Sequence, residues 1–120
     1  MQGERDPRVD LTMVGDWGTA NFHTILGWIS AHMRWRSAPR SKFTIKTGSA
    51  YREGIELVGT GEADLAITTP SHMGVRWALE GRHFYGGRAF PHLRTLGCLP
   101  QDDRLTLAVR ADTGISSFAD

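Results

Sequence analysis

The sequence predicts an α/β domain, a three-layer sandwich in which helices cover both faces of a mostly parallel sheet. Segments with the apolar patterns of short strands alternate with segments whose apolar residues recur at helical spacing. Glycine, proline and small polar residues separate these segments. The resulting order, β-α-β-α-β-α-β-β, needs right-handed crossovers, which place parallel strands in one sheet with the helices on its faces.

Five segments have the pattern of strands. The first lies in VDLTMVG, where apolar and polar residues alternate up to a glycine. The last two lie in LRTLGCL and RLTLAVRA, which the polar turn PQDD joins. We expect strands over residues 10–14, 43–47, 64–68, 93–99 and 105–110.

Three longer segments have the pattern of amphipathic helices, and we place them near residues 20–35, 51–59 and 71–80. In the first, Phe22, Ile25, Leu26, Ile29 and Met33 form one apolar stripe. Trp28 lies off this stripe, so it could cover a loop or a second lobe. We expect the second helix to end at Gly59 or Gly61 and the third at Gly81. A further helix is expected to begin at Ser116 or Ser117.

The composition fits one folded domain, because 120 residues are enough for one core and too few for two. A net charge of +1 gives no electrostatic reason to expect binding to nucleic acid or to an anionic membrane. The basic cluster in MRWRSAPRSK therefore indicates a solvated helix end and loop. MQGERDPRVD lacks the apolar stretch of a secretory signal, so a cytoplasmic location and a start after a removed signal both stay open. Residues 1–9 are expected to be a disordered or added tail.

The single cysteine, Cys98, excludes an internal disulfide, and its apolar neighbours predict a small buried residue. His23 and His72 fall near predicted loops, but neither has a carboxylate or cysteine at ligand spacing. We therefore expect neither a metal site nor a cofactor. Asp64 begins a predicted strand, where a structural hydrogen-bonding role fits better than a catalytic one.

A cleft is expected at the carboxyl edge of the sheet, where parallel α/β sheets bind their ligands. Three predicted strand-to-helix junctions meet there: Gly15–Asn21, Thr47–Arg52 and Thr68–His72. Each offers unpaired backbone N–H groups and the positive end of a helix dipole, which suit carboxylates. The stretch GEADLAITT leads into the third junction, where Thr68 and Thr69 either face a ligand or cap the next helix.

Within these junctions, six residues have side chains suited to a small polar ligand. An indole in the first loop can stack on a ligand, while a tyrosine offers a ring and a hydroxyl. Thr19 and Asn21 are also possible caps of the first helix. Arg52 has the geometry to bind a carboxylate with two hydrogen bonds, although a solvated surface arginine is an equal alternative. The six candidates are Trp17, Thr19, Asn21, Tyr51, Arg52 and Thr69.

Three stretches together resemble the first lobe of a type II periplasmic solute-binding protein of the TAXI family, the receptors of one class of TRAP transporters. They are LTMVGDWGTANFHTILGWISAHM, KTGSAYREGIELVGTGEADLAITTP and LRTLGCLPQDDRLTLAVRADTGISSFAD. The resemblance covers about residues 10–120, and GTGEADLAI and AVRADTGISSFAD are its most specific parts. The sequence departs from the family pattern at four positions: Asp16 and Trp17 stand where small residues are usual, Tyr51 replaces a serine, and Gly54 replaces an asparagine.

The resemblance implies a receptor lobe without catalytic activity. It would bind a small solute, an organic acid or amino acid, outside the cytoplasm and deliver it to membrane permease subunits. A second lobe would lie beyond this chain, and the exposed cleft face would favour self-association. Two alternatives use the same fold, a cytoplasmic enzyme and a ligand-sensing module of a regulator, and the fold alone does not choose among them.

Overall fold

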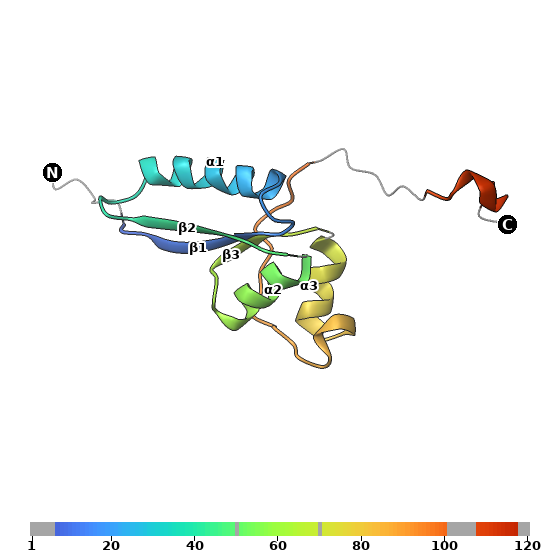
Figure 1. The fold of residues 1–120 in the computed structure, drawn as a ribbon. Helices are drawn as coiled ribbons and strands as arrows, with labels where there is room; N and C mark the ends of the chain where they lie inside the picture. The colour runs from blue at the N-terminus through green and yellow to red at the C-terminus, as the bar shows by residue number, and fades with distance from the viewer. Residues whose placement is uncertain (1–6, 50, 70, 101–107, 118–120) are drawn as a thin grey trace.

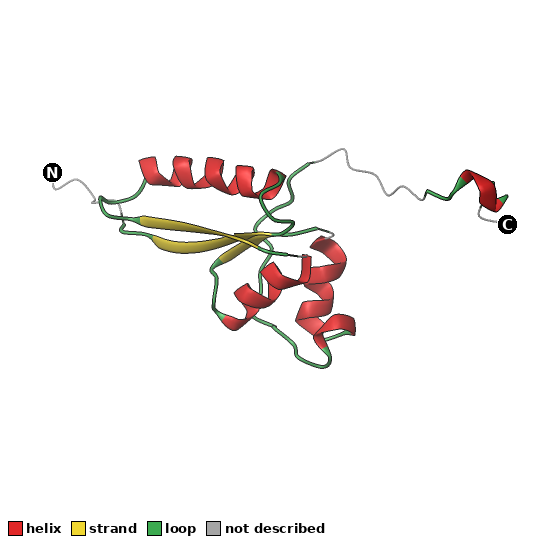
Figure 2. Cartoon of the chain, viewed as in Figure 1, coloured by secondary structure: helices red, strands yellow, loops and turns green. Residues whose placement is uncertain are grey.

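The computed structural model describes residues 7–49, 51–69, 71–100 and 108–117. Its sheet has three parallel strands in the order β2-β1-β3. These are β1 (Asp10–Gly15), β2 (Lys42–Thr47) and β3 (Leu65–Ile67). The helices are α1 (Asn21–Trp35), α2 (Tyr51–Thr60) and α3 (Ser71–Glu80), with 3₁₀ turns at His83–Tyr85 and Ala111–Thr113 (Figure 2).

The elements form three layers, with α1 on one face of the sheet and α2 and α3 on the other (Figure 1). Gly15 lies against α1, because a β-carbon there would be 3.3 Å from Leu26 Cδ1 and 3.2 Å from the backbone of Phe22. Gly54 of α2 packs on the opposite face, because a β-carbon there would lie 3.2 Å from Ala66 Cβ. The predicted α/β class and parallel pairing are therefore confirmed.

The first six predicted elements are confirmed, with boundaries that agree within about one residue. β3 is shorter than expected, because Asp64 forms a pair of reciprocal hydrogen bonds with Thr12 instead of extending the β1–β3 ladder. The Asp64 N–H donates to the Thr12 carbonyl (2.8 Å), and the Thr12 N–H donates to Asp64 Oδ2 (2.8 Å). The structural role expected for Asp64 is thus confirmed. Gly61 and Gly81 end α2 and α3 with positive φ angles, as predicted.

The strand predicted over 93–99 is wrong, because this segment has no regular structure. A strand needs a partner for its backbone groups, and β3 is only three residues long. Leu93 is buried against Phe90, but the residues after it are exposed. Arg94 bonds back to its own segment, at the carbonyls of Pro91 (2.9 Å) and Leu93 (2.7 Å).

The C-terminal predictions fall partly outside the described residues. Of the strand expected at 105–110, residues 105–107 are not described, and 108–110 have no regular structure. The helix expected to begin at Ser116 or Ser117 is not formed at those two residues. Residues 108–117 are exposed and extend away from the body, which contributes to a long axis of 74 Å against 32 and 22 Å (Figure 1).

The core lies mainly between α2, α3 and the segment that follows them. Five buried residues form one cluster: Ile55, Ala78, Tyr85, Phe90 and Leu93. Gly59 permits close packing there, because a β-carbon at this position would lie 2.6 Å from the Phe90 ring. At the N-terminal end, the carbonyls of Pro7 and Val9 accept hydrogen bonds from Ala38 (3.0 Å) and Lys42 (2.8 Å). This contact ties part of the expected tail, residues 7–9, to the loop after α1, whereas residues 1–6 are not described.

Candidate functional site

The three strand-to-helix junctions meet at the carboxyl edge of the sheet, as the parallel topology predicts. Backbone hydrogen bonds tie them together. The Asp16 N–H donates to the Ile67 carbonyl (3.3 Å), the Gly18 N–H donates to the Gly48 carbonyl (2.9 Å), and the Gly48 N–H donates to the Gly15 carbonyl (2.8 Å). The first loop therefore contacts both of the others.

Asp16 is the buried centre of this junction, with a relative exposure of 0%. Its Oδ1 accepts a hydrogen bond from the N–H of Gly54 (3.1 Å), near the start of α2. Its Oδ2 is also buried and makes no hydrogen bond of normal geometry within the described part of the chain. The position of this side chain requires glycine at both neighbouring sites. A β-carbon at Gly48 would lie 2.5 Å from Asp16 Oδ1, and one at Gly54 would lie 2.8 Å from the same atom.

The environment of this carboxyl group favours its protonated form. Burial raises the pKa of Asp16 above the ordinary aspartate value of 3.8, and the nearby charge of Glu53 raises it further. Interactions with the Thr68 hydroxyl and the Gly54 N–H lower this pKa, but burial is the larger effect. Glu53 itself is half-buried, and its pKa is lowered because its Oε2 accepts hydrogen bonds from the hydroxyl and the N–H of Ser49, both at 2.6 Å.

Asp16 and Gly54 contact each other, although they lie 38 residues apart in the chain. The aspartate side chain occupies space that a larger residue at position 54 would need. Sequence reasoning did not select Asp16 as a site residue. The signal was present in the sequence as two unusual residues far apart in the chain, but only the fold shows that they meet.

Trp17 follows Asp16 in a strained backbone conformation. Its φ angle is 67° and that of Gly18 is 68°, so both residues are left-handed. This conformation costs little for glycine, but it is uncommon for a large side chain. The surrounding hydrogen bonds of Asp16 and Gly18 hold it in place, and the indole is half exposed at 50%. Strained residues of this kind are concentrated at binding sites in proteins.

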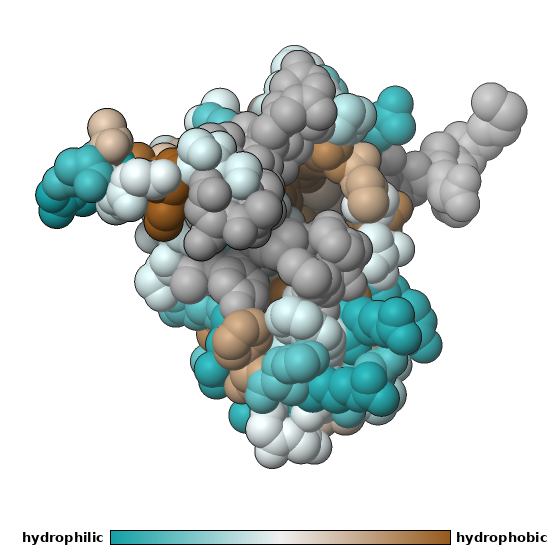
Figure 3. Space-filling model, turned by 90° about the vertical axis from the view of Figure 1, so that its right-hand side faces the viewer, coloured by the Kyte–Doolittle hydropathy of each residue, from teal (hydrophilic) through white to brown (hydrophobic). Residues whose placement is uncertain are grey.

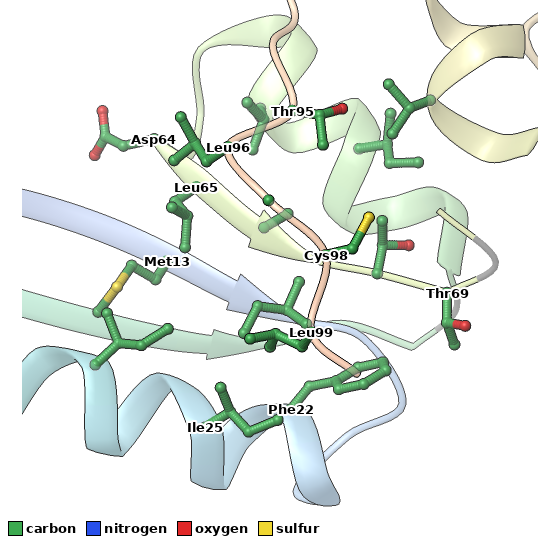
Figure 4. Close-up of a pocket in the computed structure, with 18 of the residues that line it drawn as sticks. Met13, Phe22, Ile25, Asp64, Leu65, Thr69, Thr95, Leu96, Cys98 and Leu99 are labelled. Carbon is green, nitrogen blue, oxygen red and sulfur yellow. The ribbon is translucent and has the colours of Figure 1, made fainter. Parts of the chain in front are cut away.

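A cleft of about 1100 Å³ lies next to this junction, between α1, β3 and the irregular segment 93–100. Its walls are mainly apolar, and Figure 4 shows Phe22 and Ile25 of α1 on one side and Leu65 of β3 on another. The segment carrying Thr95 to Leu99 runs along it (Figure 4). Hydrophobic residues border a hollow on this side of the molecule (Figure 3). The polar side chains at its walls include Asn21, Thr24, Asp64, Thr68, Thr69 and Thr95.

Two of the six predicted site residues, Asn21 and Thr69, line this cleft together. Trp17 and Thr19 are exposed at the junction and do not line it. Arg52 is exposed on α2, and its Nε donates to Glu56 Oε1 at 2.7 Å. Tyr51 is the first residue of α2. Residues of the first and third junctions therefore line the cleft together, whereas Arg52 of the second junction forms an ion pair with Glu56.

Two further predictions at the site are wrong. Ala20, not Thr19 or Asn21, is the N-cap residue of α1, and no side chain caps this helix. Cys98 is exposed rather than buried, because the strand that would have carried it into the core is not formed. The Cys98 side chain lines the cleft instead (Figure 4). Within the described ranges, no group of three or more His, Cys, Asp or Glu side chains could hold a metal ion.

Comparisons of the chain with protein-family models, with curated proteins and with solved structures found no match. None of the helices in the described part of the structure is both long and apolar enough to cross a membrane.

Proposed function

We propose that this chain is one lobe of a solute-binding protein that takes a small organic acid or amino acid. The main support for this proposal is that three strand-to-helix junctions meet at one edge of the sheet, beside a cleft of about 1100 Å³. Clefts at this edge are the usual ligand sites of parallel α/β sheets. The resemblance to TAXI receptors supports the finer proposal that the protein serves a TRAP-type transporter.

The charges around the junction favour one end of the cleft for an anionic group. At the start of α2, the carboxyl groups of Asp16 and Glu53 already accept hydrogen bonds from nearby backbone N–H groups. The first turns of α1 and α3 contain no acidic residue. A ligand carboxylate would therefore be more favourable near Asn21, at the start of α1, and Thr69, just before α3.

As a receptor, the protein would work outside the cytoplasm and pass its solute to the permease subunits of the transporter. A second lobe would close on the cleft and remove most of the ligand surface from water. The described lobe provides one wall, so its own affinity would be modest. Copies of the chain could also associate through the exposed cleft face.

Calorimetry with a panel of amino acids and dicarboxylates tests this site. Arg52→Ala is expected to leave the affinity nearly unchanged, because Arg52 lies outside the cleft and its Nε donates to Glu56 Oε1 at 2.7 Å. Thr69→Val should cost about 0.5–1.5 kcal/mol, because the hydroxyl is lost while the shape is nearly kept.

Arg76→Ala is the matched control for the arginine, because Arg76 makes the same type of pair with Glu80 (Nε to Oε1, 3.2 Å) on α3. This control should leave the affinity unchanged. If a ligand binds tightly and the Thr69 substitution does not alter its affinity, the cleft is in the wrong place. If no member of the panel binds, the proposed ligand class is wrong.

A further inference from the structure

The solvent-facing side of α1 carries an aromatic stripe made of Trp28, His32 and Trp35. Trp28 and Trp35 are 62% and 88% exposed. They are seven residues apart, or about two helical turns, so they lie on the same side of the helix. His32 lies between them, with its ring centroid 4.2 Å from that of Trp28 and its Nδ1 3.0 Å from the Trp28 carbonyl oxygen.

This stripe is separate from the face that holds α1 on the sheet. Leu26 is fully buried on the inner face. Figure 1 shows α1 as the outermost layer, with no described element over its outer side. Large exposed apolar side chains are unfavourable in water, and two tryptophans in one row are more than scattered surface residues.

The sequence around the stripe carries charges of one sign. No acidic residue occurs between Asp16 and Glu53, whereas six basic residues do: Arg34, Arg36, Arg40, Lys42, Lys46 and Arg52. The rest of the chain has eight basic and thirteen acidic residues, so the net charge of +1 hides a strong asymmetry. Arg36 follows the last residue of α1 directly, Arg40 lies in the loop before β2, and both are exposed.

We propose that the outer face of α1, together with Arg36 and Arg40, binds the surface of an anionic lipid bilayer. Indole rings favour the headgroup region, where their apolar rings and polar N–H groups are both accommodated. Arginines at the helix end complement lipid phosphates. A convex helix face without a groove fits a flat bilayer surface, and the helix would lie on it rather than cross it. This site is independent of the proposed solute cleft.

Vesicle sedimentation of the whole chain tests the proposal. Binding is expected to vesicles of phosphatidylcholine mixed with phosphatidylglycerol, with a blue shift of tryptophan emission, and to fall steeply with added salt. Binding to pure phosphatidylcholine should be much weaker. Arg36→Gln combined with Arg40→Gln should reduce the partition coefficient about 25-fold, at roughly fivefold for each cation. Trp28→Ala combined with Trp35→Ala should reduce it by tenfold or more and abolish the blue shift.

Matched variants on other surfaces distinguish binding by the stripe from nonspecific binding to vesicles. Arg76→Gln with Arg82→Gln removes two exposed cations on and after α3, and Val109→Ala trims an exposed apolar side chain. Neither should alter binding by more than about twofold. Absence of binding to anionic vesicles at low salt would overturn the proposal, as would equal losses in stripe and control variants. Binding of single-stranded DNA in preference to vesicles would also overturn it.

Discussion

Asp16 illustrates how a single side chain can join loops that are distant in sequence. Its Oδ1 accepts a hydrogen bond from Gly54, while its backbone N–H bonds to the carbonyl of Ile67. Burial disfavours its ionised form, so the same side chain that connects the loops also makes the fold sensitive to pH. Protonation of Asp16 increases the stability of the folded state, and this increase is complete below the pKa of the same group in the unfolded chain. It is lost as pH rises through the higher pKa of the folded chain.

Asp16→Asn is therefore expected to raise the free energy of unfolding at neutral pH, because the amide keeps an oxygen for the Gly54 N–H without a charge. The advantage should shrink as pH falls through the raised pKa of the folded chain toward 3.8, because the wild-type carboxyl becomes protonated over this range. Asp16→Ala should cost about 1–3 kcal/mol, since it leaves the Gly54 N–H unpaired. Denaturant unfolding across this pH range measures all three proteins, with Asp10→Asn as an exposed control. An Asp16→Asn protein that is less stable than the native one at every pH would refute this account.

Gly54 offers a second test at the scale of one residue. Gly54→Ala places a β-carbon 2.8 Å from Asp16 Oδ1 and 3.2 Å from the Ala66 side chain, so it should lower the stability by about 1–3 kcal/mol. Gly27→Ala is the matched change in α1, where no atom lies within 4 Å. It should raise the stability by about 0.5–1 kcal/mol, because alanine is the better helix former. Thermal unfolding compares the two, and a stabilising Gly54→Ala would mean that the junction is looser than described.

At the scale of elements, the sequence was most informative where one pattern persisted for several turns or residues. The apolar stripe of α1 and the alternation in β1 predicted both elements within about one residue. The segment 93–99 has an equally apolar pattern, but periodicity does not show whether a partner strand is available. The exposure of Cys98 follows from that missing partner. The candidate site was predictable as a set of junctions, whereas the buried role of Asp16 depended on contacts across the sheet.

The two faces of α1 should respond differently to truncation. Leu26 is fully buried, so Leu26→Ala is expected to reduce the free energy of unfolding by about 2–4 kcal/mol. Trp28 is 62% exposed two residues later, and Trp28→Ala should change stability by no more than about 0.5 kcal/mol. Chemical denaturation followed by circular dichroism would measure both. A large loss in the Trp28→Ala protein would show that the indole is covered by another part of the protein.

At the scale of the whole molecule, the described chain is extended and leaves apolar surface uncovered. Its radius of gyration is 18.7 Å, whereas a compact domain of this length would have about 14 Å. Leu96 and Leu99 border the cleft and are 84% and 55% exposed. Both features indicate that the chain has surface available for a partner.

We therefore expect reversible self-association at high protein concentration. Size-exclusion chromatography with light scattering should show a mass that rises with concentration, since association would bury apolar surface at the cleft. Leu96→Ser combined with Leu99→Ser should shift the protein toward the monomer. Trp28→Ser with Trp35→Ser removes apolar surface on the opposite side and should have less effect. A strict monomer at every concentration would contradict this expectation.

The central position of β1 has a consequence for the order of events during synthesis. β1 pairs with β2 about 30 residues later and with β3 about 50 residues later. The unit β1-α1-β2 is complete once residue 47 has left the ribosome, before Gly54 has emerged. Asp16 would remain hydrated during this interval, and its dehydration would be delayed until α2 docks. The nascent chain can thus acquire its first pair of strands before the unfavourable burial of a carboxyl group begins.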